Sequence, residues 1–386
     1  MIGSKNTIET ALHRAEEKNL TQWEFLAINC ELNVADGHAR QTLSASQSKI
    51  VEQLPQLFVE GEQRPAEEIE WEAHQAYFEL VGQRSYPADP GRVLSCYSSS
   101  VSMEIVSRSL ATSTDSVALL HPTFDNIADL LRGNGLHLVP LEEDPLQNKD
   151  LDPRLLEQVG CVFVTTPNNP SGRVLGRERL HRLAAQCARH GVVLALDTSF
   201  RGFDRQAQYD HYAVLQSSGC RWLVIEDTGK LWPTLDLKAG LLVWSEHLKL
   251  PLYEIYSDIL LGVSPLILAL IREFARDAAD GGLVELHEFI ASNRKLVRTE
   301  LAGVPEVSFP DLDNRCSVER VHLGRRSGLG TWAELSRRHN VYALPCRAFH
   351  WHNPQEGEHM LRIALARSIE PLGRSVRALR DVLANC

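Results

Sequence analysis

The sequence has no long hydrophobic run, no excess of positive charge and no paired-cysteine motif. Its longest apolar stretch, Ile259–Ile271, is too short for a bilayer and is interrupted by Ser264 and Pro265, so we expect no membrane span. Asp and Glu number 50 against 40 Lys and Arg, without a basic run, which argues against nucleic-acid binding. The first residues lack the apolar core of a signal peptide, so we expect the protein in the cytoplasm.

The cysteines carry no recognisable metal or disulfide pattern. They have no CxxC spacing and no histidine at a distance suited to zinc, so we expect reduced thiols and no metal ion. Hydrophobic residues make up 44% of the chain and charged residues 23%, which is typical of a globular protein and excludes disorder. The eight cysteines are Cys30, Cys96, Cys161, Cys187, Cys220, Cys316, Cys346 and Cys386.

The middle of the chain alternates short apolar runs with longer amphipathic ones. Leu180, Leu183, Ala184 and Cys187 recur at three- and four-residue spacing and predict a helix over Gly176–His190. Strands separated by helices indicate an α/β fold with a mostly parallel sheet. The predicted strands are Val117–Leu120, Leu136–Val139, Cys161–Thr165, Val192–Leu196, Trp222–Ile225 and Leu241–Trp244, with Val318–Leu323 and Leu361–Leu365 in the C-terminal part.

Three polar residues follow three of these strands. Asn169 lies in the turn after Cys161–Thr165, Asp197 closes the next strand, and Lys230 follows Trp222–Ile225. Alone, Asp197 reads equally well as a helix cap and Lys230 as a surface group. Ligands bind at the carboxyl ends of strands in open α/β sheets, so together the three predict a binding site. In this order they resemble fold type I pyridoxal-phosphate (PLP) enzymes of the aspartate aminotransferase family.

That resemblance implies an α/β fold and a role for each residue. Such enzymes need a lysine for the Schiff base, an acid beside the pyridine nitrogen and donors for the phosphate. By similarity, Lys230 forms the Schiff base, Asp197 pairs with the pyridine nitrogen, Asn169 reaches the phenolic oxygen and Phe124 stacks on the ring. The implied phosphate site comprises Ser99, Ser100 and Val101 at a helix N-terminus, joined by Thr228 and Lys238, although a serine run is also an ordinary cap. Arg362 lies where the family places the arginine that binds the substrate α-carboxylate.

Three positions depart from a transaminase. Phe200 replaces the tyrosine that bonds the phenolic oxygen, Asp227 replaces a serine three residues before the lysine, and Lys238 replaces an arginine eight residues after it. An unpaired buried carboxylate is costly, so Asp227 predicts either a cationic substrate or an internal salt bridge.

The N-terminal segment completes a narrower resemblance. With Thr21, Glu24 and His38, the chain resembles the PLP-dependent L-arginine oxidases and hydroxylases of guanidino natural-product pathways such as enduracididine and indolmycin biosynthesis. The resemblance implies that Glu24 and Asp227, assisted by Thr21, hold the guanidinium, since paired carboxylates suit its planar donors. Alone, His38 reads as a structural histidine.

The same resemblance implies the reaction and the partners. Lys230 would remove the α-proton of L-arginine, and dioxygen would then accept electrons, giving hydrogen peroxide. His38 would help to bring water to the γ-carbon. The product would be 4-hydroxy-2-oxo-5-guanidinopentanoate, didehydroarginine or 2-oxo-5-guanidinopentanoate, and the sequence does not separate these outcomes.

The resemblance also implies a domain organisation and a homodimer. We expect an N-terminal helical lid and substrate segment over residues 1–45, a large PLP-binding domain over 46–290, and a small α+β domain over 291–386. One alternative is an ordinary class I/II aminotransferase acting on a basic or aromatic amino acid. Another is a non-catalytic PLP-fold sensor of a regulator, which the lack of a DNA-binding extension or basic patch disfavours.

Overall fold

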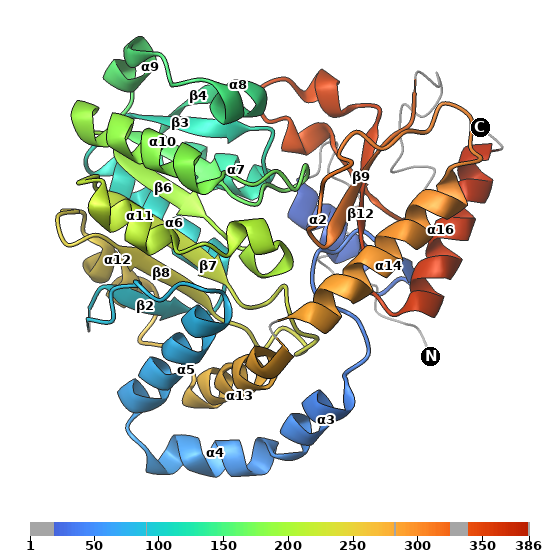
Figure 1. Cartoon of the computed structure of the whole chain (residues 1–386), viewed down its shortest axis with the longest axis horizontal. Helices are drawn as coiled ribbons and strands as arrows, with labels where there is room; N and C mark the ends of the chain where they lie inside the picture. The colour runs from blue at the N-terminus through green and yellow to red at the C-terminus, as the bar shows by residue number, and fades with distance from the viewer. Residues whose placement is uncertain (1–18, 90, 282, 325–338, 385–386) are drawn as a thin grey trace, which may run out of the picture.

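The large sheet of the protein has seven strands in the order β2-β8-β7-β6-β5-β3-β4 (Figure 1). The computed structural model describes residues 19–89, 91–281, 283–324 and 339–384. Neighbouring strands pair in parallel, except that β8 runs antiparallel to both β2 and β7. The strands are β2 (Val93–Cys96), β3 (Ser116–His121), β4 (His137–Glu142), β5 (Cys161–Thr165), β6 (Val193–Asp197), β7 (Trp222–Asp227) and β8 (Gly240–Trp244).

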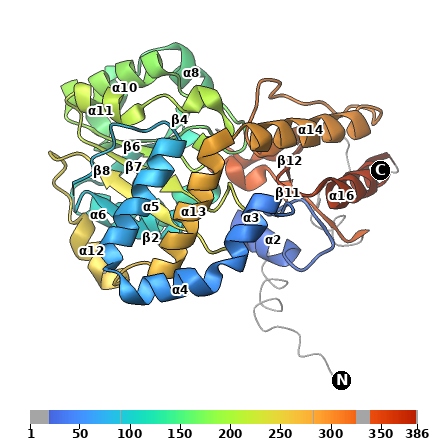
Figure 2. The same ribbon diagram turned by 60° about the horizontal axis from the view of Figure 1, so that its bottom comes forward.

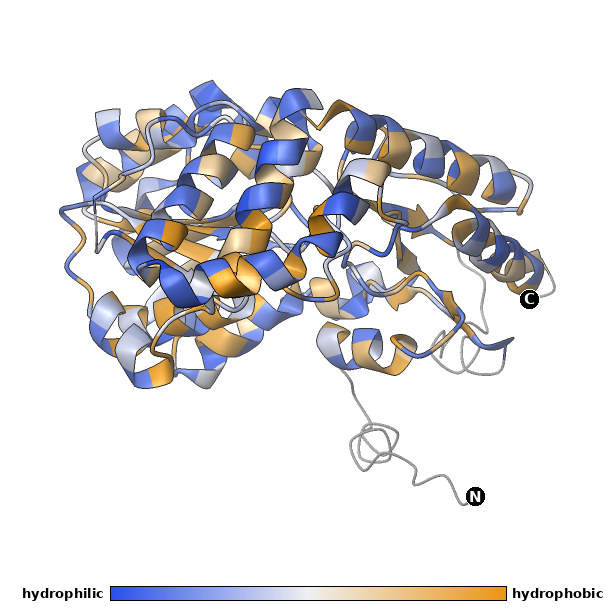
Figure 3. Cartoon of the chain, turned by 90° about the horizontal axis from the view of Figure 1, so that it is seen from below, coloured by the Kyte–Doolittle hydropathy of each residue, from blue (hydrophilic) through white to orange (hydrophobic). Residues whose placement is uncertain are grey.

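Helices cover both faces of this sheet because its central strands are apolar on both sides. In β5, Cys161 and Phe163 pack with α6, α7 and α12, whereas Val162 and Val164 pack in the other core with α10 and α11. Successive side chains of a strand point to opposite faces, so a strand buried on both is a continuous apolar run. Figure 3 shows the helices with hydrophobic and hydrophilic sides, as expected of elements that cover a core.

Helices alternate with strands along the middle of the chain. Further helices precede and follow this alternating region in the sequence. Helices α5 and α13 lie side by side in both ribbon views, and α14 crosses from the large sheet toward α16 (Figures 1 and 2). The α-helices are α2 (Leu20–Ala27), α3 (Ala45–Glu52), α4 (Leu54–Gln63), α5 (Ala66–Leu80), α6 (Ser99–Ala111), α7 (Asp125–Gly133), α8 (Glu143–Asn148), α9 (Pro153–Gln158), α10 (Arg177–His190), α11 (His211–Ser217), α12 (Leu252–Ile259), α13 (Pro265–Gly281), α14 (Val284–Leu301) and α16 (Ile369–Ala384).

The N-terminal segment joins the C-terminal part of the chain. Strand β1 (Leu32–Asn33) pairs in parallel with β10 (Val341–Tyr342), and a three-stranded sheet has the order β11-β12-β9. Its strands are β9 (Val318–His322), β11 (Leu344–Pro345) and β12 (Met360–Ala364). The short 3-10 helices are η1 (Arg201–Phe203), η2 (Arg205–Ala207), η3 (Arg347–Phe349) and η4 (Pro354–Gly357).

The structure confirms the expected fold class, and each predicted strand is found with ends that differ by at most two residues, except that β4 continues three residues beyond the predicted Val139. The helix predicted over Gly176–His190 is α10, and the apolar stretch Ile259–Ile271 is divided between α12 and α13, with Pro265 beginning the second helix. Strand β2 was not predicted, because its four residues VLSC are too short to show a period. Among the described helices, none combines the length and hydropathy that crossing a bilayer needs.

The domain boundaries at residues 45 and 290 stay predictions. Residue 45 begins α3, and residue 290 lies inside α14, so a division after 290 would cut a continuous helix. The first 18 residues and residues 325–338 lie outside the described part of the chain.

A buried ion pair lies beneath the carboxyl ends of β6 and β7. Arg201 and Glu226 are both fully buried, and the guanidinium donates to the two carboxylate oxygens at 2.9 and 3.2 Å. The hydroxyl of Tyr212 also donates to Glu226 at 3.1 Å, and that of Tyr77 at 3.4 Å. Glu226 therefore has a partner for each oxygen, which offsets the cost of burying its charge.

Removing one member of this pair tests its contribution to stability. We expect Arg201→Met to lower the free energy of unfolding by about 3–5 kcal/mol, because Glu226 keeps a buried charge without its partner. Urea denaturation followed by circular dichroism would measure the loss. The exposed Arg154→Met, which removes a surface pair with Asp152, is the control and should leave the stability essentially unchanged. Equal effects of the two variants would contradict the assignment.

Candidate active site

A cavity of about 220 Å³ lies at the carboxyl ends of β5, β6 and β7 and reaches α2 and β12. A larger cavity of about 720 Å³ lies near α3, α13 and α14, but it contains none of the predicted site residues. We favour the smaller one because it gathers the titratable groups. The predicted residues that line it are Thr21, Glu24, His38, Ser99, Ser100, Phe124, Asn169, Asp197, Asp227, Lys230, Lys238 and Arg362.

The register of the parallel strands brings the central groups together. Thr165 at the end of β5 is opposite Asp197 at the end of β6, which in turn is opposite Ile225 of β7. Asp227 is the last residue of β7, and Lys230 follows three residues later. Because the strands end at the same edge, residues far apart in the chain line one cavity.

Asp197 is the buried acid of the site. Its Oδ1 accepts hydrogen bonds from the backbone N–H and the hydroxyl of Ser199 at 3.0 and 2.5 Å. Burial raises the pKa of Asp197 to about 6 despite these donors, and the charge of Asp227 acts in the same direction, whereas Lys230 opposes it. A positively charged group of a ligand next to this carboxyl would favour its ionised form and would be attracted to it.

Asn169 and Lys230 each present to the cavity a polar group that has no hydrogen-bond partner within the described part of the chain. The side-chain oxygen of Asn169 is buried and unpaired, and the amine of Lys230 forms no hydrogen bond or ion pair with a described residue. Buried polar groups are normally satisfied, so a ligand is expected to contact Asn169.

The N-terminus of α6 borders the same cavity. Ser98 caps the helix by accepting the N–H of Val101 at 3.3 Å, and Ser99 donates to Asp227 at 2.7 Å. Asn126 donates to Ser100 at 3.1 Å. Gly240 lets the strand pass under this turn, because a Cβ there would lie 2.5–2.6 Å from backbone atoms of Ser98 and Ser99.

At the opposite end, Glu24 of α2 pairs with Arg362 of β12. The guanidinium donates to Glu24 Oε1 at 3.0 Å and also to the carbonyl of Ala35. Arg362 is 1% exposed, and its Nε has no partner among the described residues. Sequence analysis assigns Glu24 to a substrate guanidinium and Arg362 to a substrate carboxylate, but the structure pairs these two residues with each other.

His38 is held by residues that the sequence analysis did not single out. Its Nδ1 lies 2.5 Å from Asp36 Oδ1, and its Nε2 lies 2.7 Å from the amine of Lys238. Burial acts to raise the pKa of Asp36, but its contacts with His38 and with Arg367 lower it well below the usual range. Arg367 also donates to the carbonyls of Asn33, Asp36 and His38 and so holds this loop.

Helix α2 is attached to α7 through Asp125, the first residue of α7. A capping box formed by Asn19 and Gln22 begins the helix, and the N–H of Leu20 donates to Asp125 Oδ2 at 2.8 Å. Leu20 is fully buried in a small core that also contains Phe349 and contacts Phe124. Burial raises the pKa of Asp125 to about 7, although the N–H of Leu20 acts to lower it.

Two predicted residues do not line the cavity. The N–H of Val101 is bonded to Ser98, and the hydroxyl of Thr228 donates to the carbonyl of Ala239 and accepts its N–H. Their roles stay predictions. Phe200 is buried and does line the cavity, where it offers no hydroxyl. Other lining residues that sequence reasoning missed are Ser98, Met103, Asn126, Thr165 and Ser199; the serine two residues after Asp197 was the available signal.

Comparison with known proteins identifies the family. The model of "Aminotransferase class I and II" matches residues 67–379. The chain belongs to the class I and II aminotransferase family. This is a PLP-binding family, and the chain is an enzyme of its fold.

Individual relatives differ in how much of the chain they match. A solved structure of "MppP soaked with the product 2-ketoarginine" is 71% identical, with a TM-score of 0.90, and the match covers 92% of this chain and all of that one. Thermus thermophilus aspartate aminotransferase with maleate is 14% identical with a TM-score of 0.75, covers 97% and 98% of the two chains, and shows the fold alone. Human kynurenine–oxoglutarate transaminase 1 is 26% identical over 39% of this chain, and the match spans only 40% of that enzyme.

The ionisation of Asp125 provides a test of how α2 is held. Because its pKa in the folded protein is about 7, above the usual Asp value, the stability it contributes is present at low pH and is lost as pH rises toward 7. Relative to Asp125→Asn, the wild-type protein should lose on the order of 3 kcal/mol between pH 4 and 7.5. Denaturation at several pH values would measure this difference. Exposed Asp115→Asn is the control, and parallel curves for wild type and Asp125→Asn would refute the prediction.

Proposed function

We propose that this enzyme oxidises free L-arginine with dioxygen, using bound PLP. The observation that carries the proposal is the 71% identity, over 92% of the chain, to the protein whose structure was solved with 2-ketoarginine. The charges of the cavity support it independently, because the same cavity holds two carboxylates suited to a cation and one buried arginine suited to an anion.

The pairing of Glu24 with Arg362 suits a substrate that carries both charges. The guanidinium of L-arginine would replace Arg362 as the partner of Glu24, while the substrate carboxylate would replace Glu24 as the partner of Arg362. This exchange leaves no buried charge unpaired, which a neutral side chain would not achieve. It also reconciles the roles predicted for Glu24 and Arg362 with the ion pair in the structure.

Asp227 would be the second carboxylate for the guanidinium. Its two oxygens accept hydrogen bonds from Ser99 and from the N–H of Gly229, at 2.7 and 2.6 Å. Both donors are neutral, so the carboxylate is held in place without a cationic partner among the described residues. A forked guanidinium would supply the missing positive charge, with Thr21 assisting at the cavity wall.

The residues of the cavity fit the cofactor. Lys230 would hold PLP covalently, Asp197 would face its pyridine nitrogen, Asn169 its phenolic oxygen, and Phe124 its ring. Ser99, Ser100 and Lys238 would face its phosphate, with Val101 and Thr228 as further predicted contacts. When bound, PLP supplies an electron sink for the substrate α-carbon.

Side chains of the protein would then move the proton, and helix α2 would limit the access of solvent to the cavity. The Lys230 amine would take the α-proton, and Arg362 would hold the carboxylate so that this proton faces the amine. Helix α2 would cover the cavity. Dioxygen would accept two electrons and two protons, giving hydrogen peroxide, with 2-oxo-5-guanidinopentanoate and ammonia after addition of water. His38, oriented by Asp36, would bring water to the γ-carbon in the hydroxylating variant of this reaction, whereas the desaturating variant would release didehydroarginine without adding water.

Oxygen consumption in the absence of a keto-acid acceptor tests this function. L-Arginine should cause oxygen uptake and peroxide formation by the yellow holoenzyme, and mass spectrometry would distinguish the keto, hydroxylated and unsaturated products. Lys230→Ala should lose both the yellow absorbance and the activity. A silent oxygen electrode with accumulation of pyridoxamine phosphate would instead establish an ordinary aminotransferase, the function that the family membership would otherwise favour.

Charge-removing variants test the guanidinium site. Asp227→Asn and Glu24→Gln should each weaken L-arginine at least about tenfold more than the neutral isostere citrulline, because each loses a charge-assisted hydrogen bond to the cation. Titration of the holoenzyme's visible spectrum would give both affinities. Glu31→Gln, an exposed acid of the same N-terminal segment, is the matched control. Equal losses for the two ligands would remove these residues from the guanidinium site.

A further inference from the structure

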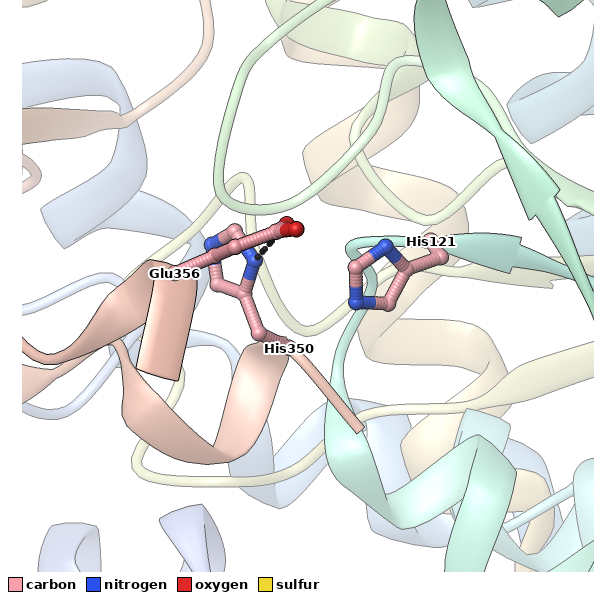
Figure 4. A group of neighbouring side chains, drawn as sticks. All are labelled: His121, His350 and Glu356. Atoms are coloured by element: carbon pink, nitrogen blue, oxygen red, sulfur yellow. Dashed lines mark hydrogen bonds and ion pairs between the residues drawn. The ribbon is translucent and has the colours of Figure 1, made fainter. Parts of the chain in front are cut away.

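A second cluster of titratable groups lies outside the active-site cavity. His121 is the last residue of β3, His350 follows η3, and Glu356 belongs to η4. One ligand atom of each lies within 4.8 Å of the others. Figure 4 shows the Glu356 carboxylate beside the His350 ring and directed toward His121. The cluster therefore joins the large sheet to the segment that precedes β12.

Each histidine has one nitrogen without a partner in the described part of the chain. The Nδ1 of His121 contacts Glu142 at 3.3 Å and that of His350 contacts Glu356 at 3.4 Å, both longer than usual for bonds to a carboxylate. The Nε2 atoms of His121 and His350 have no hydrogen bond, although the residues are only 1% and 4% exposed. The His350 nitrogen that faces Glu356 is Nδ1, and its Nε2 lies on the other side of the ring (Figure 4), so the orphaned nitrogen that this cluster has to explain is the buried Nε2 of His121.

We propose that His121, His350 and Glu356 bind a first-row divalent cation such as Zn²⁺. Two imidazoles and one carboxylate are a ligand set that Zn²⁺ accepts, with solvent completing the coordination through the exposed side of Glu356. Modest closing of the three groups would bring them to coordination distance. Their positions in the chain hide the site from sequence reasoning, since His121 lies more than 200 residues before the other two.

The surroundings suit this assignment. The Nδ1 of buried His350 faces Glu356, and Arg320 is a positively charged group near this ring. Arg320 is itself paired with Asp311 through bonds of 2.7 and 2.8 Å. Glu142 would accept a hydrogen bond from the Nδ1–H of His121 and orient that ring, as outer carboxylates do for metal-binding histidines.

The backbone around the cluster is already fixed. The indole N–H of Trp351 donates to the carbonyl of Leu120 at 2.9 Å, and the N–H of Thr123 donates to the carbonyl of Phe349 at 3.1 Å. Phe124, which follows His121 in the chain, packs against Phe349, which precedes His350. Their ring centroids are 5.8 Å apart. A bound cation would therefore cross-link two segments that meet beside the active-site cavity.

Cobalt and zinc titrations of the untagged, EDTA-treated holoenzyme test the proposal. One equivalent of Co²⁺ should give visible d–d bands, and Zn²⁺ should displace them. Removing a ligand in Glu356→Ala or His350→Gln should weaken Zn²⁺ by about a hundredfold, because even outer-shell partners contribute 10- to 100-fold. Glu356 is exposed, so its variant should fold normally, which circular dichroism would verify.

The matched control is Glu358→Ala, which removes an exposed carboxylate two residues from Glu356 that pairs with Arg347 instead. Binding at one equivalent that is kept in this control and lost in Glu356→Ala and His350→Gln would support the site. Absence of binding, binding unaffected by Glu356→Ala, or equal loss in the control would overturn it.

Discussion

Two buried guanidinium groups on one stretch of chain hold together the substrate end of the molecule. Arg362 of β12 and Arg367 just beyond it donate to backbone carbonyls of Asn33, Ala35, Asp36 and His38. Asn33 ends β1, whereas Ala35, Asp36 and His38 lie in the loop that follows it, where the arginines supply donors that water would otherwise provide. Without them the loop would lose its position, and with it His38 of the cavity wall and Asp36, which contacts His38.

The large sheet and its ligand-binding edge could be predicted from the sequence because their signals are local. Cys161–Thr165 reads as a strand in isolation, and Asn169, Asp197 and Lys230 each follow such a strand directly. Parallel pairing then places these residues at one edge, so order along the chain was enough to bring them together.

The supporting contacts could not be predicted, because they depend on pairings between distant segments. Asp125 bonds the N–H of Leu20 across 105 residues, and Arg367 reaches the loop at Asn33 across more than 300. Neither residue stands out by type or spacing. The pairing of Glu24 with Arg362 was missed for a different reason: the resemblance assigns each to a ligand, and it does not describe how these charges are balanced without one.

The N-terminal segment is attached at separate points to the rest of the protein: Leu20 at Asp125, and β1 at β10. Thr21 and Glu24 lie in α2 of this segment, and His38 follows β1. The residues Asn169, Asp197, Asp227 and Lys230 lie instead at or just after the strand ends of the large sheet. The cavity wall is thus built from two separate parts of the chain, a short N-terminal stretch and the strand ends of the large sheet. An exchange of the N-terminal stretch for another sequence would therefore replace Thr21, Glu24 and His38 in the cavity wall and leave the groups at the strand ends unchanged.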